Sequence, residues 1–93
     1  MDCESRKRDS WGMDSQFNQL RNVLAQNVRA RRKELALSQE ELAFEAEIDR
    51  TYVSQIERST IDPSLLVLYK VARALQTEVP TLLVLPQTLQ IRV

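Results

Sequence analysis

The side chains best suited to chemistry in this sequence are hydrogen-bonding ones, and they gather between residues 49 and 60. That segment holds two guanidinium groups, several hydroxyls and an amide. The chain offers much less for catalysis, because it contains no His and a single cysteine, Cys3. This composition excludes His-based acid–base chemistry, a zinc site built from His and Cys, and an internal disulfide. We therefore expect a binding protein rather than an enzyme, with no metal and no cofactor.

Length and composition favour one small domain. The 93 residues are 43% hydrophobic, and 13 basic and 13 acidic residues cancel to a net charge of zero. No apolar run approaches the roughly 18 residues of a membrane span, and the first residues lack an apolar signal region. We therefore expect a cytoplasmic protein without membrane contact.

The charges are arranged in bands along the chain. Residues 1–33 hold eight basic and four acidic groups, residues 34–49 hold six acidic and no basic groups, and residues 50–93 hold five basic and three acidic groups. Such bands are usually solvated helix faces. If the protein binds a polyanion, the acidic side chains of residues 34–49 would have to point away from it.

The elements that position the polar cluster are predicted to be helices. Residues 1–14 show no apolar period and predict a mobile arm. Ser15 is a plausible N-cap, and apolar residues at helical spacing predict a helix from there to about Ala36. These residues are Phe17, Leu20, Leu24, Val28 and Leu35.

Capping residues define the next two helices. Ser38 and Glu41 have the spacing of a capping box, which predicts a helix over residues 39–46. Asp49 is a plausible N-cap for a helix from Arg50 to about Arg58. A fourth helix is predicted to begin at Pro63, and a short apolar turn ends before Pro86. The expected core residues of this domain (15–86) are Leu42, Ala43, Ile48, Val53, Ile56, Leu65 and Leu68. The tail, residues 87–93, alternates polar and apolar and predicts a short strand or a dimer contact.

Two adjacent stretches of the sequence indicate a known family. The motif LSQEELAFEAEIDRTYVSQIER is followed after a loop by PSLLVLYKVARAL. Together they resemble the lambda-repressor-like, or XRE-type, helix-turn-helix family across about residues 21–85, and the segment IDRTYVSQIER looks most like restriction–modification controller proteins. The resemblance implies an all-α compact bundle of about five helices, with the helix-turn-helix at residues 38–58. It also implies a transcriptional regulator that binds double-stranded DNA.

Helix geometry and the resemblance together suggest DNA-contacting residues. Because Val53 and Ile56 point inward, the outer face of their helix presents the candidate base contacts Arg50, Thr51, Ser54 and Gln55. Arg50 could form the bidentate contact with guanine O6/N7 in the major groove, or instead pair with Glu47. The candidate phosphate contacts are Gln39, Tyr52, Arg58, Ser59 and Thr60.

Other charged residues have structural interpretations. Arg32 and Glu57 correspond to a family ion pair that fixes the second helix of the motif. Arg29 or Arg31 could assist phosphate binding, or complement the dipole at the end of their own helix. The family often has Gly at three turns where this chain has Ala36, Glu47 and Ser59, so these residues are expected to need a left-handed backbone.

One domain of this size contacts few base pairs, so we expect a two-fold homodimer on a near-palindromic operator. The predicted dimer contacts are the apolar residues Leu66, Val79, Leu82, Leu83, Val84 and Leu85. Bound at an operator, the dimer would block RNA polymerase or recruit it. Alternatives are a phage-type repressor or an antitoxin of the same fold, or a protein–protein adaptor that no longer binds DNA.

Overall fold

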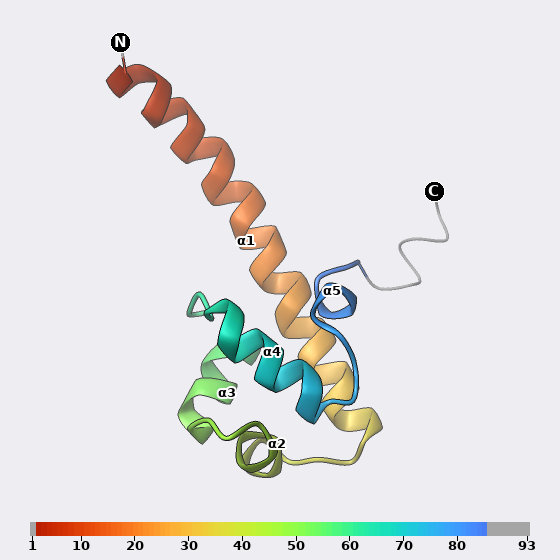
Figure 1. Cartoon of the computed structure of the whole chain (residues 1–93). Helices are drawn as coiled ribbons and strands as arrows, with labels where there is room; N and C mark the ends of the chain where they lie inside the picture. Colours follow the sequence, from red (N-terminus) through yellow and green to blue (C-terminus); the bar gives the residue numbers. More distant parts are fainter. Residues whose placement is uncertain (1, 86–93) are drawn as a thin grey trace.

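The computed structural model describes the backbone of residues 2–85 and the side chains of residues 15–85. Within that part of the chain every regular element is a helix: α1 (Asp2–Glu34), α2 (Gln39–Ala46), α3 (Arg50–Glu57), α4 (Leu65–Ala74) and α5 (Val79–Leu82). Helices α2 to α5 surround the C-terminal half of α1, whose N-terminal half extends away from them (Figure 1). The all-α fold predicted from the sequence is confirmed. The predicted strand falls in residues 87–93, outside the described residues.

One hydrophobic core joins all five helices. Its buried members are Leu24 and Val28 from α1, Leu42, Ala43 and Ala46 from α2, Val53 and Ile56 from α3, Val71, Ala72 and Leu75 from α4 or its end, and Leu82 from α5. Ile48 and Leu68 pack against this cluster as predicted. Leu65 does not, because it lies at the start of α4 on the solvent side with 74% of its surface exposed. The prediction that Leu65 is a core residue is therefore wrong.

Capping residues mark the starts of α2 and α3. The Ser38 hydroxyl accepts a hydrogen bond from the Glu41 N–H at 3.0 Å, and the Glu41 carboxylate accepts one from the Ser38 N–H at 2.8 Å. This is the predicted capping box, and α2 spans the predicted residues. Asp49 is the N-cap residue of α3, although its side chain makes no capping hydrogen bond.

Two helix starts differ from the prediction. Helix α1 begins at Asp2, so Ser15 lies inside it and is not an N-cap. No proline interrupts the preceding residues, and their backbone extends away from the other helices (Figure 1), so no apolar period is required of them. Helix α4 begins at Leu65 rather than Pro63, because the Ser64 hydroxyl caps it by accepting from the Val67 N–H at 3.1 Å.

Each of the four longer helices is followed by a residue with a left-handed backbone. The φ angles are 58° at Ala36, 60° at Glu47 and 60° at Ser59, the three residues at which this conformation was expected, and 58° at Gln76. None of the four is glycine. These turns therefore have a backbone conformation that glycine adopts without steric cost, at a cost of about 1 kcal/mol or more for each side chain.

Candidate nucleic-acid interface

Helix α3 presents a polar outer face. Val53 and Ile56 are buried, which fixes the rotation of the helix about its axis. Arg50 and Thr51 are exposed, and Ser54 and Gln55 are half-buried. All four predicted base-contact residues are therefore accessible on one short helix. Among the described residues Arg50 forms no ion pair, so the alternative pairing with Glu47 is not observed.

A tight turn holds α3 against α2. The backbone N–H of Ile48 donates to the Ala43 carbonyl at 3.0 Å, and the N–H of Glu47 donates to the Phe44 carbonyl at 3.2 Å. The half-buried Ile48 side chain packs against the core beside them. The turn therefore sets the angle at which α3 leaves α2.

A buried ion pair holds the C-terminal end of α3. Arg32 donates to the Glu57 carboxylate at 2.6 and 3.0 Å, and Gln39 adds a hydrogen bond to the same carboxylate at 3.1 Å. Arg32 also donates to the Leu37 carbonyl at 2.9 Å. The side chains of Glu57 and Arg32 are 1% and 13% exposed. The predicted ion pair is present, and it ties α1, the start of α2 and the end of α3 together.

The surroundings of Glu57 keep its carboxylate ionised. Burial by itself raises the pKa of Glu57, but hydrogen bonds from Arg32 and Gln39 and the positive charges of Arg32 and Arg29 outweigh burial and lower the pKa below its usual value. The hydrogen bond to Glu57 is the main reason that the pKa of Arg32 is raised. The pair is therefore fully charged at neutral pH.

The predicted phosphate contacts differ in accessibility. Arg58 and Thr60 are exposed at the end of α3, with hydrogen bonds to the Ser54 and Gln55 carbonyls at 3.3 and 3.2 Å. The Ser59 hydroxyl donates to the Arg21 carbonyl at 3.4 Å, and Tyr52 packs partly against the core. The structure thus leaves Arg58 and Thr60 the most available of this group.

Arg29 and Arg31 have different environments, although the sequence did not distinguish them. Arg31 donates to the Leu75 and Gln76 carbonyls at 2.9 and 3.4 Å and pairs with Glu34 at 3.0 Å. It therefore binds the carbonyls at the end of α4, and it also lies in the last turn of its own helix, where a cation complements the dipole. The side chain of Arg29 is 53% exposed.

Sequence reasoning missed the role of Asn27. Its amide donates to the Leu82 and Val84 carbonyls at 2.8 and 2.7 Å and so fastens the end of α5 to α1. The only feature of the sequence that could have indicated this role is that the Asn27 amide lies next to the apolar residues of α1.

The predicted dimer contacts differ in exposure. Leu82 is 2% exposed and belongs to the core, so its assignment to a dimer interface is wrong. Val79 and Leu83 also pack partly against the core. Leu66, Val84 and Leu85 are exposed, by 61%, 47% and 51% respectively.

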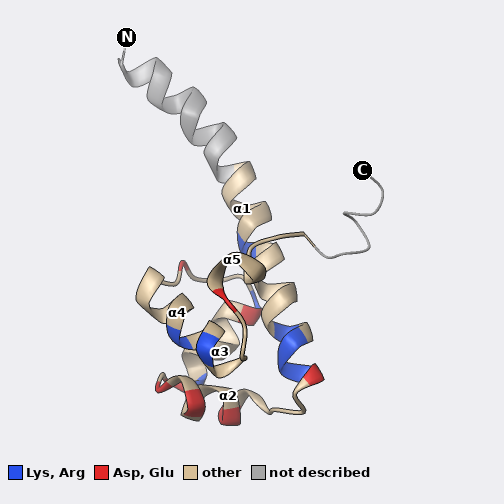
Figure 2. Ribbon diagram, turned by 45° about the vertical axis from the view of Figure 1, so that its right-hand side comes forward, with Lys and Arg blue, Asp and Glu red and all other residues tan. Residues whose placement is uncertain are grey.

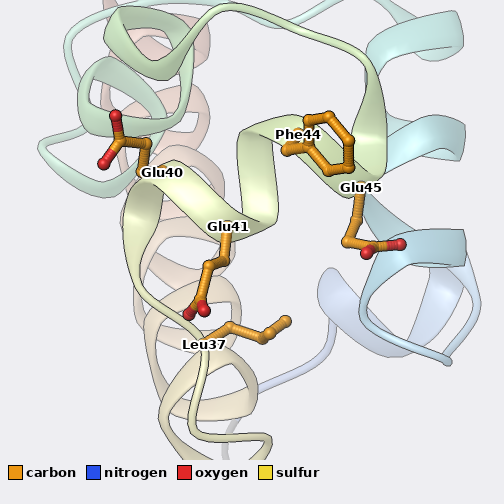
Figure 3. Close-up of a pocket in the computed structure, with 5 residues that line it drawn as sticks. All are labelled: Leu37, Glu40, Glu41, Phe44 and Glu45. Carbon is orange, nitrogen blue, oxygen red and sulfur yellow. The ribbon is translucent and has the colours of Figure 1, made fainter.

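Acidic residues dominate the outer side of α2. Figure 2 shows them at the edge of the domain, apart from the basic band in the last turns of α1. Glu40, Glu41, Glu45 and the 81% exposed Phe44 line an open pocket of about 450 Å³ together with Leu37 (Figure 3). These carboxylates would repel phosphate, so this pocket does not suit a nucleic acid. Within the described residues no group of His, Cys, Asp and Glu could hold a metal ion, and none of the described helices is long and apolar enough to span a membrane.

Known proteins are similar to this chain in sequence and in fold. A helix-turn-helix family model matches residues 28–82. The control protein C.SmaI of Serratia marcescens is 42% identical over 67 residues, which are 72% of this chain and 80% of that protein.

Two crystal structures are similar. The hypothetical transcription factor NHTF from Neisseria superposes with a TM-score of 0.73 at 42% identity, covering 82% of this chain and 88% of that chain. The restriction-modification controller protein C.AhdI from Aeromonas hydrophila superposes with a TM-score of 0.65 at 39% identity, covering 67% and 94%. This chain belongs to the XRE-type helix-turn-helix family of transcriptional regulators.

Proposed function

We propose that this protein is a regulator that binds double-stranded DNA sequence-specifically through α3. The observation that supports this proposal is the outward face of α3, where Arg50, Thr51, Ser54 and Gln55 are accessible while the Arg32–Glu57 pair holds the helix from behind. An α-helix fits the major groove, where an Arg can contact guanine O6 and N7 together. Thr51 would contact a base edge or a thymine methyl, and Gln55 an adenine.

Contacts to the DNA backbone would fix the register of α3 in the groove. We assign them to Arg58 and Thr60 and to the backbone N–H groups at the start of α2, near Gln39. Ser59 and Tyr52 are retained as further candidates. The Gln39 side chain would act indirectly, because its amide is already bonded to Glu57.

The proposed active form is a two-fold homodimer that places two α3 helices about 34 Å apart on a near-palindromic operator. Exposed apolar residues favour an interface that includes Leu66, Val84 and Leu85, with Val79 and Leu83 at its edge.

The similarity to C.SmaI and C.AhdI supports a restriction–modification controller acting in the cytoplasm. Bound upstream of a promoter the dimer would recruit RNA polymerase, and bound across it the dimer would block polymerase. A phage-type repressor or an antitoxin would have an integrase gene or a toxin gene as its neighbour instead of a methyltransferase gene.

The test begins with selection of bound duplexes from a random pool, which yields the operator and its symmetry. Arg50→Ala is expected to weaken binding to that operator at least about tenfold, or roughly 1.4 kcal/mol, because the bidentate contact is lost. Arg50→Lys keeps the charge but not the planar fork, so it should lose discrimination at the contacted base pair. Arg73→Ala removes a charge from α4 and serves as the control. Binding of the Arg50→Ala variant at wild-type strength would refute the assignment.

A second candidate function is a protein–protein adaptor, and the exposed Phe44 among carboxylates on α2 is the observation that favours it. In that case the random pool would yield no enriched duplex. Phe44→Ala would then abolish the interaction with the partner protein while leaving thermal unfolding unchanged.

A further inference from the structure

Among the described residues, Arg29 has its ion-pair partner in Glu57, which also binds Arg32 more closely. Two guanidinium groups face the single carboxylate of Glu57. Arg32 donates to it at 2.6 and 3.0 Å, whereas the Arg29 Nε lies 3.7 Å from Glu57 Oε1, too far for a hydrogen bond. One carboxylate offsets one guanidinium, so a positive charge remains on the 53% exposed side chain of Arg29.

Arg29 lines a polar pocket between α1 and the end of α3. The pocket has a volume of about 230 Å³, and its other lining residues are Asn22, Ala25, Gln26, Glu57 and Ser59. The exposed Asn22 and Gln26 lie two turns and one turn before Arg29, respectively, on the same face of α1. Both amides can donate hydrogen bonds. With Glu57 already paired, amide donors and a surplus cation suit an anion with several oxygen acceptors.

The pocket lies between two places already proposed to contact the DNA backbone. Ser59, beside Arg58 and Thr60, is part of its lining. On the other side, Gln39 at the start of α2 donates to Glu57 Oε1, the same oxygen that faces Arg29. A strand of DNA backbone that passes from the start of α2 to the end of α3 would therefore pass Arg29.

We propose that Arg29, assisted by the amides of Gln26 and Asn22, binds a backbone phosphate of the operator, so that α1 is a DNA-contacting element in addition to α2 and α3. This inference rests on the proposed function. Arg31, two residues further along α1, does not share the role, because its guanidinium is bonded to the carbonyls at the end of α4.

The salt dependence of operator binding tests the proposal. Each phosphate neutralised by a cation contributes about −0.9 to the slope of log K against log salt concentration. Arg29→Ala is therefore expected to make the slope less steep by about 0.9 per protomer, or about 1.8 for a dimer. Arg29→Lys should restore the slope, and Arg73→Ala should leave it unchanged. Urea unfolding of each variant shows that the fold is intact, and Arg29→Gln replaces Arg29→Ala if that variant unfolds.

A duplex with one phosphate replaced by an uncharged methylphosphonate gives a second readout that uses the wild-type protein. At one position per half-site, the replacement should weaken wild-type binding but weaken binding of the Arg29→Ala variant no further. An unchanged slope together with equal losses for both proteins at every position would overturn the role of Arg29 and leave the proposed function intact. Failure of the wild-type protein to bind any duplex would instead overturn the proposed function.

Discussion

Glu57 is an ionised group that is almost completely buried. Its side chain is 1% exposed, so its charge is stabilised by hydrogen bonds from Arg32 and Gln39 and by the nearby charge of Arg29. The sequence predicted the pair with Arg32 through the family motif. It gave no sign of the Gln39 contact, because Gln39 and Glu57 are 18 positions apart and meet only when α2 and α3 pack. Removal of one partner from such a pair leaves the other charge without compensation.

Glu57→Gln is therefore expected to lower the free energy of unfolding at pH 7 by about 3 kcal/mol. The folded pKa of Glu57 is below its usual value, so the unfolded chain takes up the proton first as the pH falls. The contribution of the pair is present above about pH 4.5 and is lost as the pH falls through the folded pKa. Urea unfolding from pH 3 to pH 7 should show the difference between wild type and variant shrinking toward acid. Glu78→Gln, on an exposed residue, is the control, and a difference that stays constant with pH would contradict this account.

The helix ends share an unusual feature. Ala36, Glu47, Ser59 and Gln76 all have φ near 60° and all have side chains. Glycine is the residue that occupies this conformation without steric cost. The chain therefore forms its four turns with residues that disfavour them, and each turn is a place where stability can be gained.

Ala36→Gly should raise the free energy of unfolding by about 0.5–1 kcal/mol, because relief of the left-handed backbone exceeds the added entropy of the unfolded chain. Ala30 is the matched control, since it is also an exposed alanine but lies inside α1. There, glycine should destabilise the protein by about 1 kcal/mol. The midpoints of urea unfolding of the two variants should shift in opposite directions, and shifts of the same sign would show that backbone conformation does not decide the effect.

Helix boundaries could be predicted where a side chain defines them. Ser38 and Glu41 predicted the start of α2, because a capping box is local and its spacing is visible in the sequence. Asp49 predicted the start of α3, although its side chain makes no capping hydrogen bond there. The start of α1 could not be predicted in this way. Its N-terminal half extends away from the other helices (Figure 1), so no apolar period identifies it as helical.

At the scale of the whole molecule, the inward or outward direction of individual leucines could not be predicted where apolar residues are consecutive. In the run from Leu82 to Leu85 every residue is apolar, so no period distinguishes the two sides. The structure buries Leu82 and exposes Leu85 because the Asn27 amide fastens the Leu82 and Val84 carbonyls to α1. The same ambiguity at Leu65 and Leu66 is resolved by the Ser64 cap, which sets where α4 begins.

This distinction between buried and exposed leucines determines how self-association should respond to mutation. Leu66 and Leu85 are largely exposed in the isolated chain, so a lysine at either position should leave the monomer folded. Burial of a leucine contributes about 1.5–3 kcal/mol, and a two-fold interface loses two copies at once. Leu66→Lys or Leu85→Lys is therefore expected to raise the dimer dissociation constant by tenfold or more in sedimentation equilibrium.

Leu82→Ala provides the contrast, because it removes a buried side chain from each protomer. It should lower the free energy of unfolding by about 2–5 kcal/mol, through a loss of fold rather than of contact between protomers. If neither lysine variant changes the dissociation constant, the interface lies elsewhere on the molecule. If the wild-type chain is monomeric even on its operator, two α3 helices are not held one helical turn apart, and recognition must rest on a single half-site.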